Sequence, residues 1–86
     1  VLSARQAGVC ETFAKNGFAF SNFAHDTNAH AVPLLSGCLA RFECRKAAQH
    51  DAGDHVIIVG EVERVELGDG DALAFFAGQY GQFART

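Results

Sequence analysis

The chain has 86 residues, of which 49% are apolar, and its formal net charge is −3. This length allows at most one small domain, and the apolar content argues against intrinsic disorder. The basic residues are scattered, which argues against nucleic acid as a partner. No apolar run reaches the roughly 18 residues of a membrane span. No basic segment precedes a hydrophobic stretch, so the sequence predicts no signal peptide.

The first half of the chain predicts one helix and one loop. Residues 3–15 carry apolar side chains at helical spacing, and Ser3 with Gln6 forms a capping-box pattern. Asn16-Gly17 predicts the end of this helix with a glycine cap. Residues 18–30 are aromatic and polar without a period, which predicts an irregular surface loop with room for one helical turn.

The second half predicts strands joined by short turns. Strands are expected over residues 38–48, 55–67 and 72–76, with turns at 49–54 and 68–71 and a glycine-spaced aromatic loop at 78–83. Gly60 predicts a bulge or a close approach within the second strand. The pattern is that of an antiparallel meander after one helix. So small a sheet needs more strands or a second subunit to cover its faces.

The turn Gly53-Asp54-His55 carries the first candidate site. It places an imidazole at the start of an apolar strand, beside an acid that could orient or charge the ring. One interpretation is a strand-end histidine satisfied by Asp54 or a backbone carbonyl. The other is a ligand-facing ring that hydrogen-bonds or moves a proton near neutral pH. The residues alone leave both open.

Other chemistries are weaker. His50, Asp51, Asp54 and His55 crowd together, but they lack a metal-binding spacing, and no metal is predicted. The acids of residues 68–71 lack the later ligands of a calcium loop. The cysteines, an odd number without framework spacing, predict reduced thiols in the cytoplasm and small packing side chains rather than nucleophiles. They are Cys10, Cys38 and Cys44, the last two expected on one strand face.

Segments along nearly the whole chain resemble the short-chain flavin reductases, in the order of that family. They are Val1-Leu2-Ser3-Ala4-Arg5-Gln6 with Phe13-Ala14; Pro33 to Ala40 leading to Glu43-Cys44-Arg45; Asp51-Ala52-Gly53-Asp54-His55 with Val59-Gly60-Glu61-Val62; and Gln79-Tyr80-Gly81. The resemblance implies a mainly β fold, a split β-barrel of Greek-key type with one or two helices, incomplete in this chain. Residues 1–86 would be the C-terminal portion of a single domain, because Val1-Leu2 reads as the end of a strand.

The same resemblance implies a function. The whole protein would be a homodimer that uses NADH or NADPH to reduce FMN or FAD and passes reduced flavin to a flavin-dependent monooxygenase. His55 matches the histidine near the nicotinamide and is the predicted catalytic residue. The predicted cofactor-binding residues are Val1, Leu2, Gln6, Gly53, Asp54, His55, Gln79, Tyr80 and Gly81.

Two departures keep alternatives open. Gln79 stands where the family usually has an arginine, so a charge expected near the dinucleotide is missing. The N-terminal half, which in this family contacts much of the flavin, is absent, and this chain alone is expected to be inactive. The alternatives are a non-catalytic flavin-binding or dimerisation module and an oxidase that retains its flavin.

Overall fold

The computed structural model describes residues 1–83 and 86. Its elements in chain order are the 3-10 helix η1 (Ala4–Gln6), the α-helix α1 (Ala7–Lys15), the 3-10 helix η2 (Ala19–Asn22), and the strands β1 (His25–Thr27), β2 (Pro33–Leu35), β3 (Ala40–Asp51), β4 (Val56–Leu67), β5 (Leu73–Phe76) and β6 (Gln79–Gln82). The chain is therefore mainly β with one α-helix, as the sequence predicted.

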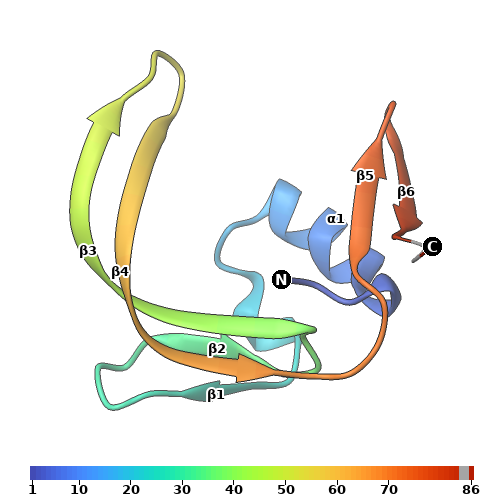
Figure 1. The fold of residues 1–86 in the computed structure, drawn as a ribbon, viewed down its shortest axis with the longest axis horizontal. Helices are drawn as coiled ribbons and strands as arrows, with labels where there is room; N and C mark the ends of the chain where they lie inside the picture. Colours follow the sequence, from blue (N-terminus) through green and yellow to red (C-terminus); the bar gives the residue numbers. More distant parts are fainter. Residues whose placement is uncertain (84–85) are drawn as a thin grey trace.

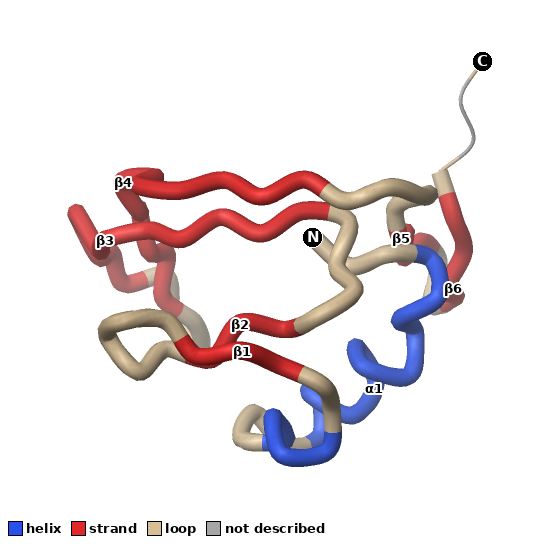
Figure 2. The backbone as a smooth tube through the Cα atoms, turned by 90° about the horizontal axis from the view of Figure 1, so that it is seen from below, coloured by secondary structure: helices blue, strands red, loops and turns tan. Residues whose placement is uncertain are grey.

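The strands pair as three antiparallel hairpins: β1 with β2, β3 with β4, and β5 with β6. Figure 1 shows β3–β4 as a long curved ribbon, with β1–β2 beneath its first half and β5–β6 near α1. Figure 2, turned by 90°, shows β1–β2 again alongside that ribbon. The prediction of one continuous meander is wrong, because no ladder joins the three hairpins in the described part of the chain.

The predicted helix is confirmed as η1 followed by α1. The backbone N–H of Ser3 donates to Oε1 of Gln6 at 2.9 Å, the glutamine half of the predicted capping box. The helix ends at Lys15 with Asn16 extended at φ −147° and its N–H donating to the Thr12 carbonyl at 3.0 Å. Gly17 has no positive φ, so the prediction of a glycine cap is wrong. No helix in the part of the chain described is long and apolar enough to cross a membrane.

The ribbon confirms the two long predicted strands and the role of Gly60. Lys46 pairs with Gly60 and Ala48 with Val59, so Ala47 is an extra, bulged residue on β3. A Cβ atom at Gly60 would lie 2.8 Å from Cβ of Cys44 on the neighbouring strand. A side chain there would collide with β3, which explains the glycine.

Several strand boundaries differ from prediction, and β5 begins at Leu73 rather than at residue 72. β3 begins at Ala40, so Cys38 lies outside it and does not share a strand face with Cys44. β3 also runs on to Asp51, which shortens the first turn and leaves His55 in the turn rather than in β4. Two predicted loops contain strands: β1 lies where residues 18–30 were expected to be irregular and pairs with β2 just beyond them, and β6 lies within the glycine-spaced loop.

Little of the ribbon is buried. Among the described residues, the buried apolar side chains are Ala19 and Ala40. The run Val56-Ile57-Ile58-Val59 of β4 is exposed by 44% or more at every position. Because successive strand residues point to opposite faces, β4 presents exposed apolar side chains on both faces of this half of the ribbon. Such a run is typical of a strand covered on both sides.

Candidate functional site

A two-residue turn carries the predicted histidine at the free end of the ribbon, between β3 and β4 (Figure 1). The N–H of Ala52 donates to the carbonyl of His55 at 3.0 Å, which closes the turn around Gly53 and Asp54. Gly53 has φ +74°, and Asp54 is not in the positive-φ region. This is the pattern of a type II′ hairpin turn, in which glycine is favoured at the first central position.

Asp54 and His55 form a hydrogen-bonded pair within this turn. Nδ1 of His55 lies 2.8 Å from Oδ1 of Asp54, and the two side chains are 64% and 98% exposed. A carboxylate only accepts, so Nδ1 carries the hydrogen. Nε2 has no hydrogen-bond partner among the described residues, and in the neutral ring its lone pair is available. The contact with Asp54 expected in the first interpretation is present, and one ring nitrogen remains free for a ligand.

The N-terminal group of predicted residues connects other elements through the backbone. The Val1 carbonyl accepts from the N–H of Leu39 at 3.0 Å, and the Leu2 carbonyl accepts from the N–H of Leu73 at 3.0 Å. The Gln6 amide is used at both ends, since Oε1 accepts from Ser3 and Nε2 donates to the Ser36 carbonyl at 3.0 Å. Gln6 therefore fixes the loop before β3 onto the start of η1.

The third group, Gln79, Tyr80 and Gly81, lies on β6. The half-buried Tyr80 ring packs edge-on against Phe75, with ring centroids 5.1 Å apart. A hydrogen bond with the Cys10 thiol, and then burial, raise the pKa of Tyr80 above its ordinary value. Gln79 is exposed and pairs with Phe76.

These three groups remain separate within this chain. No hydrogen bond or ion pair among the described residues joins one group to another. The N-terminal group and β6 both flank β5, because Leu73 bonds to Leu2 and pairs with Gln82. The turn of His55 stands apart at the end of the ribbon.

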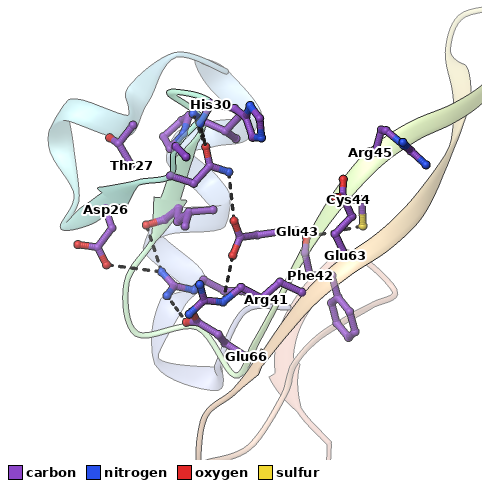
Figure 3. A pocket seen from close by; sticks show the side chains of 16 residues that line it. Asp26, Thr27, His30, Arg41, Phe42, Glu43, Cys44, Arg45, Glu63 and Glu66 are labelled. Atoms are coloured by element: carbon purple, nitrogen blue, oxygen red, sulfur yellow. Dashed lines mark hydrogen bonds and ion pairs between the residues drawn. The ribbon is translucent and has the colours of Figure 1, made fainter.

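Sequence reasoning missed a hollow that lies between β1–β2 and the first half of the ribbon (Figure 3). Its volume is about 1090 Å³, and none of the predicted site residues lines it. Arg41 is its central side chain. Nη1 donates to the carbonyls of Leu34 at 3.4 Å and Leu35 at 3.2 Å and lies 3.9 Å from Asp26, while Nη2 pairs with Glu66.

Further ion pairs line this hollow. Arg64 lies 2.8 Å from Glu66 and 3.6 Å from Glu43, and Asn28 donates to Glu43 at 3.1 Å. The hydrogen bond between Arg41 and Glu66 is the main cause that lowers the pKa of Glu66. The same hydrogen bond is the main cause that raises the pKa of Arg41. Each arginine is balanced by a carboxylate, so the hollow is a polar junction between hairpins rather than an anion site. A signal is present in the sequence, since the charged residues Arg41, Glu43 and Arg45 alternate along the strand predicted over residues 38–48.

The remaining candidates are spread out. No group of three His, Cys, Asp or Glu side chains within residues 1–83 is arranged to hold a metal ion. His50 lies in the ladder opposite Ile57, away from the turn of Asp54. Cys10, Cys38 and Cys44 are all free thiols, on α1, before β3 and on β3 respectively.

Comparison with known proteins gives the class. The family model described as "Flavin reductase like domain" matches residues 1–84, and the chain belongs to that family. Its fold agrees: BorF, the flavin reductase component of a bacterial two-component tryptophan halogenase, superposes with a TM-score of 0.83 at 33% identity. That match covers 100% of this chain and 58% of BorF. The open hairpins are thus part of a flavin reductase split barrel.

Two relatives are similar in sequence. FMN reductase (NADH) SmoA of Agrobacterium fabrum is 53% identical over 99% of this chain and 49% of its own length. A flavin reductase of Pseudomonas putida is 37% identical over 98% of this chain and 51% of its own. The chain spans about half the length of the curated relatives it matches.

Proposed function

We propose that this chain is the C-terminal portion of one flavin reductase-like domain, and that the whole protein reduces FMN or FAD with NADH or NADPH. The observation that carries this proposal is the 53% identity to an NADH-dependent FMN reductase over 99% of the chain. The outward-facing ring of His55 at the end of the ribbon supports it, because it presents a free nitrogen to a ligand.

The residues present fit the nicotinamide better than they fit phosphate. Beside His55 the backbone is accessible, since a Cβ at Gly53 would meet no atom within 4 Å. In contrast, Arg41, Arg45 and Arg64 are all paired with glutamates. We therefore assign the ring contacts to this chain and place no phosphate contact on these three arginines.

In this mechanism the chain supplies alignment. When bound, the nicotinamide and the flavin supply the hydride chemistry, from nicotinamide C4 to flavin N5. His55 would hydrogen-bond the nicotinamide and hold it at reacting distance, a contribution that needs no nucleophile. Gln6, with both ends of its amide engaged, would hold Val1 and Leu2 where they approach the flavin. Tyr80 and Gly81 would meet the nicotinamide nucleotide from β6.

The open ribbon supports a proposal for the assembly. The outer half of β4 exposes apolar side chains on both faces of the ribbon, which supports cover by the rest of the domain on one side and by a second copy on the other. We propose a cytoplasmic homodimer that passes reduced flavin to a flavin-dependent monooxygenase. Two relatives are themselves named as reductase components of monooxygenases, one of a 4-nitrophenol 4-monooxygenase and one of a flavin-dependent trigonelline monooxygenase.

The test is NADH oxidation by the whole protein, with FMN, with FAD and without flavin. The proposal predicts flavin-dependent oxidation, followed by hydroxylation when a monooxygenase component is added. The non-catalytic alternative is favoured by Gln79, which leaves an exposed neutral side chain in place of the family arginine. It predicts flavin binding without NADH turnover. Turnover with flavin retained through gel filtration, and no transfer to a second protein, would instead indicate an oxidase.

A further inference from the structure

We infer that Asp54 is a positioning residue that fixes the tautomer of His55, so that Nε2 accepts a hydrogen bond from a donor on the ligand. This inference rests on the proposed function and extends it to the chemistry that the site recognises. Asp54 itself does not touch the ligand in this account. It acts only through the ring of His55, with which it shares the 2.8 Å contact between Oδ1 and Nδ1.

The hydrogen-bonding inventory of the two side chains leads to this inference. An ionised carboxylate has no hydrogen to give, so the shared hydrogen belongs to Nδ1. A neutral imidazole carries one hydrogen only, and Nε2 is then an acceptor. The matching ligand group must carry an N–H or O–H. The primary carboxamide of nicotinamide carries such an N–H, whereas a ketone in its place does not.

The turn holds the side chains of Asp54 and His55 close to each other. Asp54 is the second residue of the two-residue turn and His55 follows it directly, where the Ala52 N–H donates to the His55 carbonyl. Asp51, the other acid nearby, lies in the β3 ladder opposite Val56 and makes no described hydrogen bond to the ring. Because Asp54 is exposed, its hydrogen bond competes with water. We therefore expect a graded effect on recognition rather than complete loss.

The first experiment reads the tautomer without using activity. Nitrogen-15 NMR of the histidine ring is recorded on the whole protein at a pH where the ring is neutral, for wild type, Asp54→Ala and the matched control Asp51→Ala. Wild type and Asp51→Ala should carry the hydrogen on Nδ1. Asp54→Ala should shift toward the Nε2–H form that free imidazole side chains prefer. The inference would be overturned if the His55 ring carried its hydrogen on Nε2 in wild type, or if the tautomer in Asp54→Ala were the same as in wild type.

The second experiment measures how strongly the enzyme recognises the carboxamide of the nicotinamide. The same variants are assayed with NADH and with its acetylpyridine analogue, which has a methyl ketone in place of the carboxamide. Since the analogue also differs in reduction potential, only the change in the preference ratio between variants is interpreted. The preference of kcat/KM for NADH should fall by about fivefold in Asp54→Ala, the worth of one ordinary hydrogen bond. It should stay unchanged in Asp51→Ala.

The two failures are distinguishable. If wild type oxidises no NADH with any flavin, the proposed function fails, while the tautomer measurement still decides the role of Asp54. If wild type oxidises NADH and the preference ratio of Asp54→Ala equals that of wild type, the function stands and the inference about recognition is wrong.

Discussion

Gly60 on β4 lies so close to Cys44 on β3 that an added Cβ would be 2.8 Å from Cβ of the cysteine. Replacing Gly60 by alanine should therefore force the two strands apart at the bulge. We expect a loss of about 1–3 kcal/mol in the free energy of unfolding of the whole protein, the usual cost of overpacking. Gly8→Ala is the matched control. Gly8 lies in α1, where an added Cβ would meet no atom within 4 Å, so this substitution should be neutral or stabilising.

Gly53 tests the turn through its backbone angle alone. Its φ is +74°, yet no atom lies within 4 Å of an added Cβ, so an alanine there is strained without any clash. Gly53→Ala should destabilise the protein by about 1–2 kcal/mol. Gly53→Asn should cost less, because asparagine tolerates positive φ better. Equal stability of Gly53→Ala and wild type in denaturant unfolding would contradict the turn geometry.

Glu66 should make stability depend on acid. Because the hydrogen bond with Arg41 lowers its pKa in the folded state, protonation favours the unfolded chain. Its contribution is present above its ordinary pKa of 4.5 and is lost as the pH falls through the lowered folded value. Glu66→Gln should be less stable than wild type at neutral pH, and this gap should close in acid.

The control for that titration is the Arg45–Glu61 pair on the outer part of the ribbon. Its atoms lie 2.6 Å apart, but both side chains are more than 60% exposed. Exposed pairs contribute little, so Glu61→Gln should stay close to wild type across the same pH range. A gap as large for Glu61→Gln as for Glu66→Gln would show that the junction between β1–β2 and the ribbon has no special role.

Tyr80 should ionise at a higher pH than a free tyrosine, because its hydrogen bond with Cys10 and its burial both favour the neutral phenol. The near-ultraviolet absorbance of tyrosinate is followed against pH in wild type, with Tyr80→Phe subtracted to isolate this residue. In Cys10→Ala the transition should move down toward the ordinary value. Because the pKa of Tyr80 is higher in the folded state than in the unfolded state, the neutral phenol stabilises the fold at pH values below the unfolded pKa. This stabilisation is lost as the pH rises through the folded pKa. An unchanged transition in Cys10→Ala would remove the thiol as the main cause.

Strong local patterns in the sequence were enough to predict the helix and the ribbon. Helical spacing predicted residues 3–15, and the apolar run after His55 predicted β4 to within one residue. Gly60 was identified as a bulge or close approach because a glycine inside an apolar strand has few other uses. Each of these signals lies within one segment.

The missed elements depend on contacts between segments. β1 is His-Asp-Thr and β6 is Gln-Tyr-Gly-Gln, short and polar runs that resemble loops until their partner strands are known. β3 continues through Gln49, His50 and Asp51 because its partner strand extends alongside, although these residues resemble a turn. The Arg41 junction was likewise invisible, since it connects Arg41 on β3 to residues of three other strands, β1, β2 and β4.

The site was predicted only as residue types. Sequence alone suggested that Asp54 could orient His55, and the 2.8 Å contact is present. That the ring stands at a free ribbon end, apart from Gln6 and Tyr80, could not be foreseen, because strand length and curvature set that separation. The role of these residues in binding stays a prediction.

The most direct test of the proposed role of His55 in aligning the nicotinamide compares two histidines on the same hairpin. NADH oxidation with FMN is measured on the whole protein for wild type, His55→Ala and His50→Ala. His50 is also exposed but lies within the β3 ladder. We expect His55→Ala to lower kcat/KM by about tenfold, equivalent to about 1.4 kcal/mol of lost alignment, while His50→Ala matches wild type. Wild-type turnover by His55→Ala, or an equal loss in both variants, would contradict it.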